Sequence, residues 1–278
     1  MNNDQSLFFL EILSAIKQAA FTVHNSLNHI STNNFTLSDF QYHKASNLGI
    51  FQINRLCSSG EYLLSNNNSN LTYSSFKIEQ LLEQISLAFS STVSEYFPVS
   101  IKCFTRLNRA FSVHTDERKL ELAILQLLYC SLKSTSIESL DPIKITFYAT
   151  ETKKHIVFHI RDTGKTLSDS VVSSLSAPDN SVSFECDKLN FNAVMAQSVA
   201  VANKAVSELS GKLEYAPLKT GNRFDIYLPK KPSSAQKQMA SPSTYVPDLA
   251  LYSATFAEFK FEHIANEIRN SADKTEEL

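Results

Sequence analysis

Glycine is scarce in this sequence. Five glycines occur among 278 residues, whereas an average protein has about 7% glycine. Loops that wrap phosphate groups need several glycines, because only a backbone without a Cβ approaches a phosphate closely. The chain therefore has little material for glycine-rich phosphate loops. Three of its five glycines, Gly164, Gly211 and Gly221, fall at expected turns.

Closely paired cysteines are also absent. Cys57, Cys103, Cys130 and Cys186 are widely spaced and form no Cys-x-x-Cys pair. This spacing indicates neither a zinc site nor a disulfide framework. Reduced thiols of this kind favour a cytoplasmic location.

No charge of one sign dominates, and no apolar run is long. The net charge of −2 with mixed signs gives no electrostatic argument for binding nucleic acid or an anionic membrane. The apolar run Leu7–Leu13 is interrupted by Glu11 and is too short to span a bilayer, and no basic leader precedes it. We expect a cytoplasmic protein without nucleic-acid binding or membrane insertion. Its 43% hydrophobic residues suffice for one large or two modest cores.

The stretch His155–Arg161 has the period of a strand with one buried face. Its apolar residues alternate with Val157, His159 and Arg161, and the turn Asp162-Thr163-Gly164 follows. A strand that leads into a glycine turn can present the Asp162 carboxylate at the mouth of a pocket.

The neighbouring elements follow in a particular order. A helix at Glu117–Thr135 precedes this strand and a second long helix begins at Phe191; the further strands are expected at Ile143–Ala149, Lys212–Ala216 and Arg223–Leu228. Together these residues resemble the ATP-binding domain of sensor histidine kinases, a fold shared with Hsp90, gyrase B and MutL. The resemblance spans Tyr73–Lys230, and its most specific motifs are ILQLLYCSLKST (124–135), DTGKTL (162–167) and SELSGKLEYAPLKTGNRFDIYLP (207–229).

Residues 5–64 predict two amphipathic helices separated by the polar run Ser31–Asp39. One helical hairpin covers its apolar stripes poorly, and a second copy would complete a four-helix bundle. We therefore predict an α+β fold, with an N-terminal helical hairpin that forms a homodimeric four-helix bundle. For the segment after it, the resemblance implies a two-layer α/β sandwich of the histidine kinase/Hsp90-like ATPase type.

The hairpin also resembles the dimerisation and phosphoacceptor domain of histidine kinases through the run FLEILSAIKQAAF, Phe9–Phe21. Ala15 stands where the family carries its phosphorylated histidine, and a methyl group cannot accept a phosphoryl group. His24, further along the same helix, is the alternative acceptor. It is more typical, however, of a polar residue on a helix surface.

The resemblance implies a nucleotide site with several replaced residues. Asp162 matches the carboxylate that accepts the adenine amino group, and Gly164, Lys133 and Thr135 also match the family pattern. Cys130 stands at the asparagine that holds Mg²⁺, and a thiol is a poor ligand for this oxygen-seeking ion. The family's glycines are replaced at Thr166, Ala196 and Ser198. We therefore expect no metal ion and no resident cofactor, and ATP binding at most weakly.

The sequence predicts three segments: a dimerisation hairpin at 1–70, a degenerate ATPase-like domain at 71–230, and a Pro/Ser-rich linker with an amphipathic tail at 231–278. The tail either folds back on the domain or docks a partner. We expect a catalytically inactive two-component signalling protein that binds a response regulator or a partner histidine kinase. Two alternatives remain open: a divergent kinase that uses ATP and His24, and a nucleotide sensor that uses Asp162 without chemistry.

Overall fold

The computed structural model of the chain describes residues 71–94, 96–97, 99–107, 111–134, 143–173, 175, 191–230, 241–242 and 244–259, and before them positions 16, 20, 23, 46, 50, 53, 55, 57–60, 62 and 63. Within these residues, no helix combines the length and the apolar character needed to cross a membrane.

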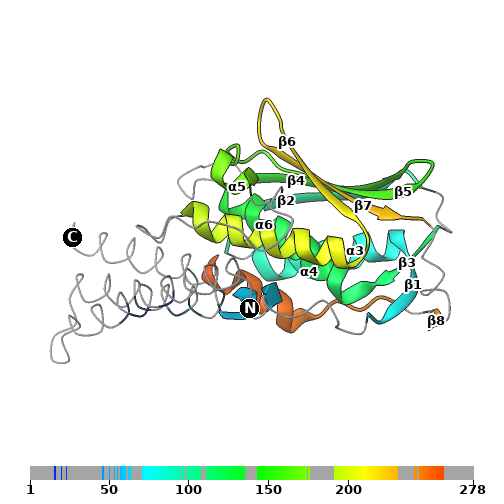
Figure 1. Cartoon of the computed structure of the whole chain (residues 1–278), viewed down its shortest axis with the longest axis horizontal. Coiled ribbons are helices and arrows are strands. Elements are labelled where there is room, and N and C mark those ends of the chain that lie inside the picture. Colours follow the sequence, from blue (N-terminus) through cyan, green and yellow to red (C-terminus); the bar gives the residue numbers. More distant parts are fainter. Residues whose placement is uncertain are drawn as a thin grey trace, which may run out of the picture.

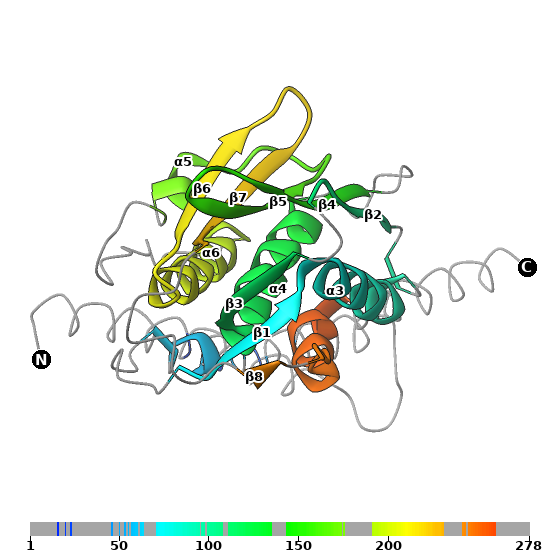
Figure 2. The same ribbon diagram turned by 90° about the vertical axis from the view of Figure 1, so that its right-hand side faces the viewer.

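A five-stranded sheet forms the upper layer of the molecule in Figures 1 and 2. Its strand order is β2-β4-β5-β7-β6, with β2 and β4 parallel and the other neighbours antiparallel. Strand β5 covers His155–Arg161, the range that its period of two predicts. The other strands are β2 (Val99–Thr105), β4 (Ile143–Glu151), β6 (Lys212–Pro217) and β7 (Asn222–Pro229). All four strands predicted from the sequence are therefore present.

Three helices cover one face of this sheet (Figures 1 and 2): α3 (Ile78–Val93), α4 (Glu117–Lys133) and α6 (Phe191–Glu208). Helix α4 begins after Asp116, whose side chain accepts a hydrogen bond from the Lys119 N–H at 3.0 Å and so caps the first turn. The short helix α5 (Asp169–Ser173) contacts α6. This arrangement confirms the predicted α/β sandwich.

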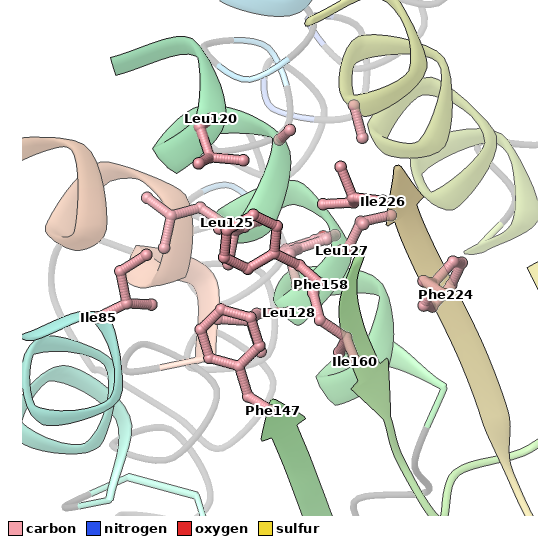
Figure 3. Packing of buried hydrophobic residues seen from close by; sticks show 14 of the residues in the cluster. Ile85, Leu120, Leu125, Leu127, Leu128, Phe147, Phe158, Ile160, Phe224 and Ile226 are labelled. Atoms are coloured by element: carbon pink, nitrogen blue, oxygen red, sulfur yellow. The ribbon is translucent and has the colours of Figure 1, made fainter. Parts of the chain in front are cut away.

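The main core lies between α4 and the central strands (Figure 3). Phe147 of β4 and Phe158 of β5 face Leu125 and Leu128 of α4 in this view, and all four side chains are fully buried. Burying each such side chain stabilises the fold by about 1.5–3 kcal/mol. The hydrophobic effect therefore fixes α4 against the strand that leads to Asp162.

A second, smaller sheet extends the helical layer. It has the order β3-β1-β8, formed by β1 (Tyr73–Lys77), β3 (Ser112–Asp116) and β8 (Ser241–Pro242). Strands β1 and β8 are parallel. This pairing returns the chain to the helical layer after the linker, because β8 lies beside β1.

Residues 249–259 form a helix that packs below α3 and α4 (Figure 2). The Phe256 ring meets the Phe89 ring at a centroid distance of 5.2 Å, and Phe259 meets Phe97 at 5.6 Å. Phe256 and Phe259 are each only 2% exposed. Of the two alternatives for the tail, residues 249–259 therefore show the first, because they fold back on the domain. The rest of the tail, residues 260–278, lies outside the described residues.

One strand residue is more deeply buried than its predicted face indicates. The alternation in β5 places Val157 on the polar face, yet Val157 is 2% exposed. Its cross-strand partners are Thr150 on β4 and Tyr227 on β7, which flank it on both sides. Neighbouring strands thus bury an apolar side chain on the face that carries no helix.

The described positions before residue 64 are all helical. Leu63 is buried against Ala200 and Val201 of α6, and Ile16 packs on the same cluster. Dimerisation of the hairpin stays a prediction, and the loop predicted at Ser31–Asp39 lies outside the described residues.

Candidate functional site

Asp162 lies directly after β5, where the backbone is tied to β7. Its N–H donates to the Asn222 carbonyl at 3.0 Å, and the Asn222 N–H donates back at 3.3 Å. Gly221 precedes Asn222 with a φ of +102°, and a Cβ there would lie 1.8 Å from the Asp162 carbonyl oxygen. Only glycine allows this approach. The turn at Gly221 therefore holds Asp162 in position.

The Asp162 carboxylate accepts three hydrogen bonds from the protein itself. Ser131 Oγ of α4 donates to Oδ2 at 2.8 Å, while Asn222 Nδ2 and the Gly164 N–H donate to Oδ1 at 2.9 and 2.8 Å. Asp162 is 2% exposed, and this burial raises the pKa of its carboxyl group, against the lowering effect of the hydrogen bonds. The carboxylate thus points into the protein rather than into an open pocket.

Gly164 packs against the end of α4. A Cβ at this position would lie 1.9 Å from Ser134 Oγ, and the next residue, Lys165, donates its N–H to the Ser134 carbonyl at 2.8 Å. The glycine turn therefore closes on α4. Thr166, at the following glycine position of the resemblance, is exposed.

Cys130 lies in direct contact with α6. Its thiol is fully buried and donates to the Met195 carbonyl at a distance of 3.7 Å. Burial raises the pKa of this thiol to about 12, so the sulfur stays protonated at neutral pH. Because Mg²⁺ requires deprotonated or neutral oxygen ligands, the side chain at this position does not fit the ion.

Helix α6 continues without a break through the positions of the missing glycines. Ala196 and Ser198 are both buried, and Ser198 Oγ donates to the Val194 carbonyl one turn earlier at 2.8 Å. The Ser198 hydroxyl therefore donates its hydrogen bond within the helix. The backbone N–H groups of a regular helix interior are engaged in its own hydrogen bonds and cannot cradle a phosphate.

Arg55 is a residue of the site that the sequence analysis did not single out. One of its Nη atoms donates to Gln126 Oε1 of α4 and to Ser198 Oγ of α6, each at 2.7 Å. The other donates to the Thr255 carbonyl at 3.3 Å, and the guanidinium carbon lies 3.4 Å from the centroid of the Tyr129 ring. A cation from the N-terminal helix thus joins α4, α6 and the C-terminal helix.

Lys133 is engaged by the C-terminal helix. Its ammonium group forms an ion pair with Glu258, which also accepts a hydrogen bond from the Tyr129 hydroxyl at 2.8 Å. Lys133 further lies 5.3 Å from the centroid of the Phe259 ring. The candidate residues Thr135, Ala15 and His24 lie outside the described residues.

The comparisons with known proteins concern the fold. No protein-family profile matches the chain, and no curated protein matches its sequence. The solved structure of the Acinetobacter baumannii histidine kinase AdeS superimposes with a TM-score of 0.52 and 13% identity, over 78% of this chain and 96% of that one. Histidine kinase ThkA in complex with response regulator protein TrrA gives a TM-score of 0.60 and 14% identity, over 79% of this chain and 60% of that one. The chain therefore has the fold of solved histidine kinases.

Proposed function

We propose that this chain is a histidine-kinase-like signalling protein of a two-component system that transfers no phosphoryl group. It acts by binding a response regulator or a partner histidine kinase. The candidate site residues contribute a vestigial nucleotide site, in which Asp162, Gly164, Lys133 and Thr135 are retained without a metal ligand.

This proposal rests on one observation: the retained Asp162 already forms hydrogen bonds with groups of the protein itself. The Asp162 carboxylate accepts from Ser131, Asn222 and Gly164, and it is almost completely buried. Three of the roughly four acceptor sites of the carboxylate are thus occupied, so an adenine amino group would compete with the protein's own donors to reach it. Each lost hydrogen bond to a charged group costs about 1.5–3 kcal/mol, which works against nucleotide binding.

The contact between α4 and α6 supports the same conclusion. Cys130 and Met195 meet across these helices, and Arg55 bonds to both helices next to them. A triphosphate with Mg²⁺ at this place would require α4 and α6 to separate, and it would gain no oxygen ligand from the thiol. ATP is therefore expected to bind weakly, and Mg²⁺ is expected not to strengthen binding.

The partner assignment rests on the fold and on the N-terminal prediction. We infer that residues 1–70 form the dimerisation hairpin, that 71–230 form the ATPase-like domain and that 231–278 form the linker and tail. ThkA was solved with a response regulator. A chain that keeps such a fold without the acceptor at Ala15 can still offer a docking surface to a regulator or to a second kinase.

One alternative has a specific observation in its favour. Asp162 is retained, and its carboxylate accepts hydrogen bonds from Ser131 of α4 and from Asn222 of β7, so both elements meet at this group. A nucleotide sensor would use this residue for adenine without any phosphoryl transfer. A divergent kinase would instead need His24 as its acceptor.

Calorimetry with ATP, with and without Mg²⁺, tests the nucleotide site. We expect weak binding that does not respond to Mg²⁺, because neither Cys130 nor α6 supplies what a metal-bound triphosphate needs. The matched control is Asp162→Asn, which keeps the shape of the side chain. A micromolar, Mg²⁺-dependent affinity that disappears in Asp162→Asn would show a working site, whereas weak Mg²⁺-independent binding that disappears there would favour the sensor.

Labelled ATP tests the absence of phosphoryl transfer. We expect no autophosphorylation of the wild-type chain or of Ala15→His, because acceptor, metal ligand and phosphate loop act as one unit and restoring one part leaves the others missing. His24→Gln is the control for the alternative acceptor. Self-labelling of the wild type that is lost in His24→Gln would identify a divergent kinase. Self-labelling of Ala15→His alone would mean that only the acceptor was lost.

A further inference from the structure

One face of the five-stranded sheet is free of the described long helices, and its side chains have an ordered arrangement. Helices α3, α4 and α6 all lie on the opposite face (Figures 1 and 2). The strand register places one row of residues across all five strands on the helix-free face: Phe104, Tyr148, His159, Asp225 and Glu214. Side chains two residues before or after each of these point to the same face.

The first three members of this row are stacked rings. The Phe104 and Tyr148 centroids are 4.9 Å apart with an interplanar angle of 7°, and those of Tyr148 and His159 are 4.5 Å apart at 20°. His159 is held from both sides, since Nδ1 bonds to Asp225 Oδ1 at 2.6 Å and Nε2 to Thr150 Oγ1 at 2.7 Å. The stack is therefore a rigid ridge. It ends on strand β2 at Phe104, whose side chain is 41% exposed.

Four exposed cations surround this ridge: Lys102, Arg106, Lys144 and Arg161. The Arg106 guanidinium lies 5.9 Å from the centroids of both Phe104 and Tyr148, and that of Arg161 lies 5.2 Å from Tyr148. We call these four cations, with Phe104 and Tyr148, the basic face. In the described part of the chain, no carboxylate forms an ion pair with any of the four cations.

Two further cations on this face are already matched. Arg223 pairs with Asp225 at 3.1 Å, and Lys212 pairs with Glu214 at 2.6 Å. The four cations of the basic face thus lie together around β2, β4 and β5 without a carboxylate partner among the described residues, in a protein whose net charge is −2. Such a local field attracts an anionic group that the rest of the molecule repels.

The ring geometry decides which polyanion fits this charge. Proteins that bind single-stranded nucleic acid without sequence preference offer free ring faces on which bases stack. Here the faces of Tyr148 are covered by Phe104 and His159. The guanidinium groups, by contrast, remain available for bidentate hydrogen bonds to carboxylates. Phe104 adds an exposed apolar contact of the kind found at protein interfaces.

We propose that the basic face docks an acidic polypeptide segment of a partner protein. The carboxylates of this segment bond to Arg106 and Arg161, with Lys102 and Lys144 adding longer-range attraction, and an apolar side chain covers the exposed part of Phe104. The surface lies on the side of the sheet away from the helices, so it functions whether or not the nucleotide site binds ATP.

Fluorescence anisotropy of a labelled oligo-glutamate peptide against the full chain tests this surface. The wild type is expected to bind the peptide at low ionic strength and to release it as salt is added. The double variant Arg106→Glu/Arg161→Glu should lower the affinity by about tenfold or more, because it replaces attraction with repulsion at both anchors. The matched control is Lys77→Glu, an exposed charge on the small sheet, which should bind as the wild type does.

Four results would overturn the proposal. Oligo-glutamate could fail to bind the wild type at low ionic strength, or it could bind the double variant as tightly as the wild type. If Lys77→Glu lowers the affinity for the peptide as much as the double variant does, the overall charge of the protein attracts the peptide, and the basic face has no special role. Labelled oligothymidylate serves as the second probe: if it binds more tightly than oligo-glutamate and is lost in the double variant, the face is a nucleic-acid surface instead.

Discussion

Replacing Arg55 tests whether one side chain joins the N-terminal helix to the rest of the molecule. In Arg55→Met the apolar stem keeps a similar length, but the guanidinium group is lost. Gln126, Ser198 and the Thr255 carbonyl each lose a donor, and the Tyr129 ring loses its cation. The variant therefore removes one set of contacts without opening a large cavity.

The magnitude follows from these contacts. Two short hydrogen bonds to a charged donor contribute about 1.5 kcal/mol each at the lower end of the usual range, and a partly buried cation–π contact contributes about 1 kcal/mol. Against this, the buried Arg55 Nε has no hydrogen-bond partner and costs about 1 kcal/mol. Arg55→Met is thus expected to lower the free energy of unfolding by about 3 kcal/mol.

Urea denaturation followed by circular dichroism measures this loss, and thermal melting should show a Tm lower by roughly 6–12 °C. Arg118→Met is the matched control, because Arg118 is an exposed arginine on α4 and should change stability by less than about 0.5 kcal/mol. If Arg55→Met unfolds within about 0.5 kcal/mol of the wild type, the guanidinium contacts do not hold the helices together.

Two further substitutions test the surroundings of Asp162. Burial raises the pKa of its carboxyl group, so the stability that the group contributes is fully present below its unfolded pKa and is lost as the pH rises through the folded value. Asp162→Asn lacks this loss, so its stability relative to the wild type should increase with pH across that window. Urea titrations at a series of pH values measure this difference. If the free energies of unfolding of the two proteins change in parallel with pH, the raised pKa of Asp162 is contradicted. Gly221→Ala should lower the free energy of unfolding by at least about 2 kcal/mol, from left-handed strain and the clash with the Asp162 carbonyl. An unchanged denaturation midpoint would be inconsistent with the positive φ.

The elements of the sandwich were predictable because their signals are local. The range of β5 follows from alternation within His155–Arg161, and α4 follows from the apolar spacing within Glu117–Thr135. Val157 shows the limit of such patterns. Its burial depends on Thr150 and Tyr227, and no periodicity within β5 contains those neighbours.

The surroundings of the candidate site were less predictable because they join distant segments. Arg55 and Ser198 are 143 residues apart, and an isolated arginine on a helix usually faces solvent. The pairing of Lys133 with Glu258 likewise requires the fold-back of the C-terminal helix, which the sequence leaves open against partner docking. Residue types alone identify Cys130 as an unsuitable metal ligand, but only the structure places it against Met195.

The C-terminal helix has a consequence for the order of events during synthesis. Phe256 and Phe259 complete an aromatic cluster with Phe89, Phe97 and Tyr129, which lie far earlier in the chain. Chains emerge from the ribosome in sequence order, so these earlier rings stay uncovered until residues 249–259 have been made. During that interval the nascent protein presents an aromatic surface that a chaperone would shield. Final compaction is therefore a late step that follows translation of the linker.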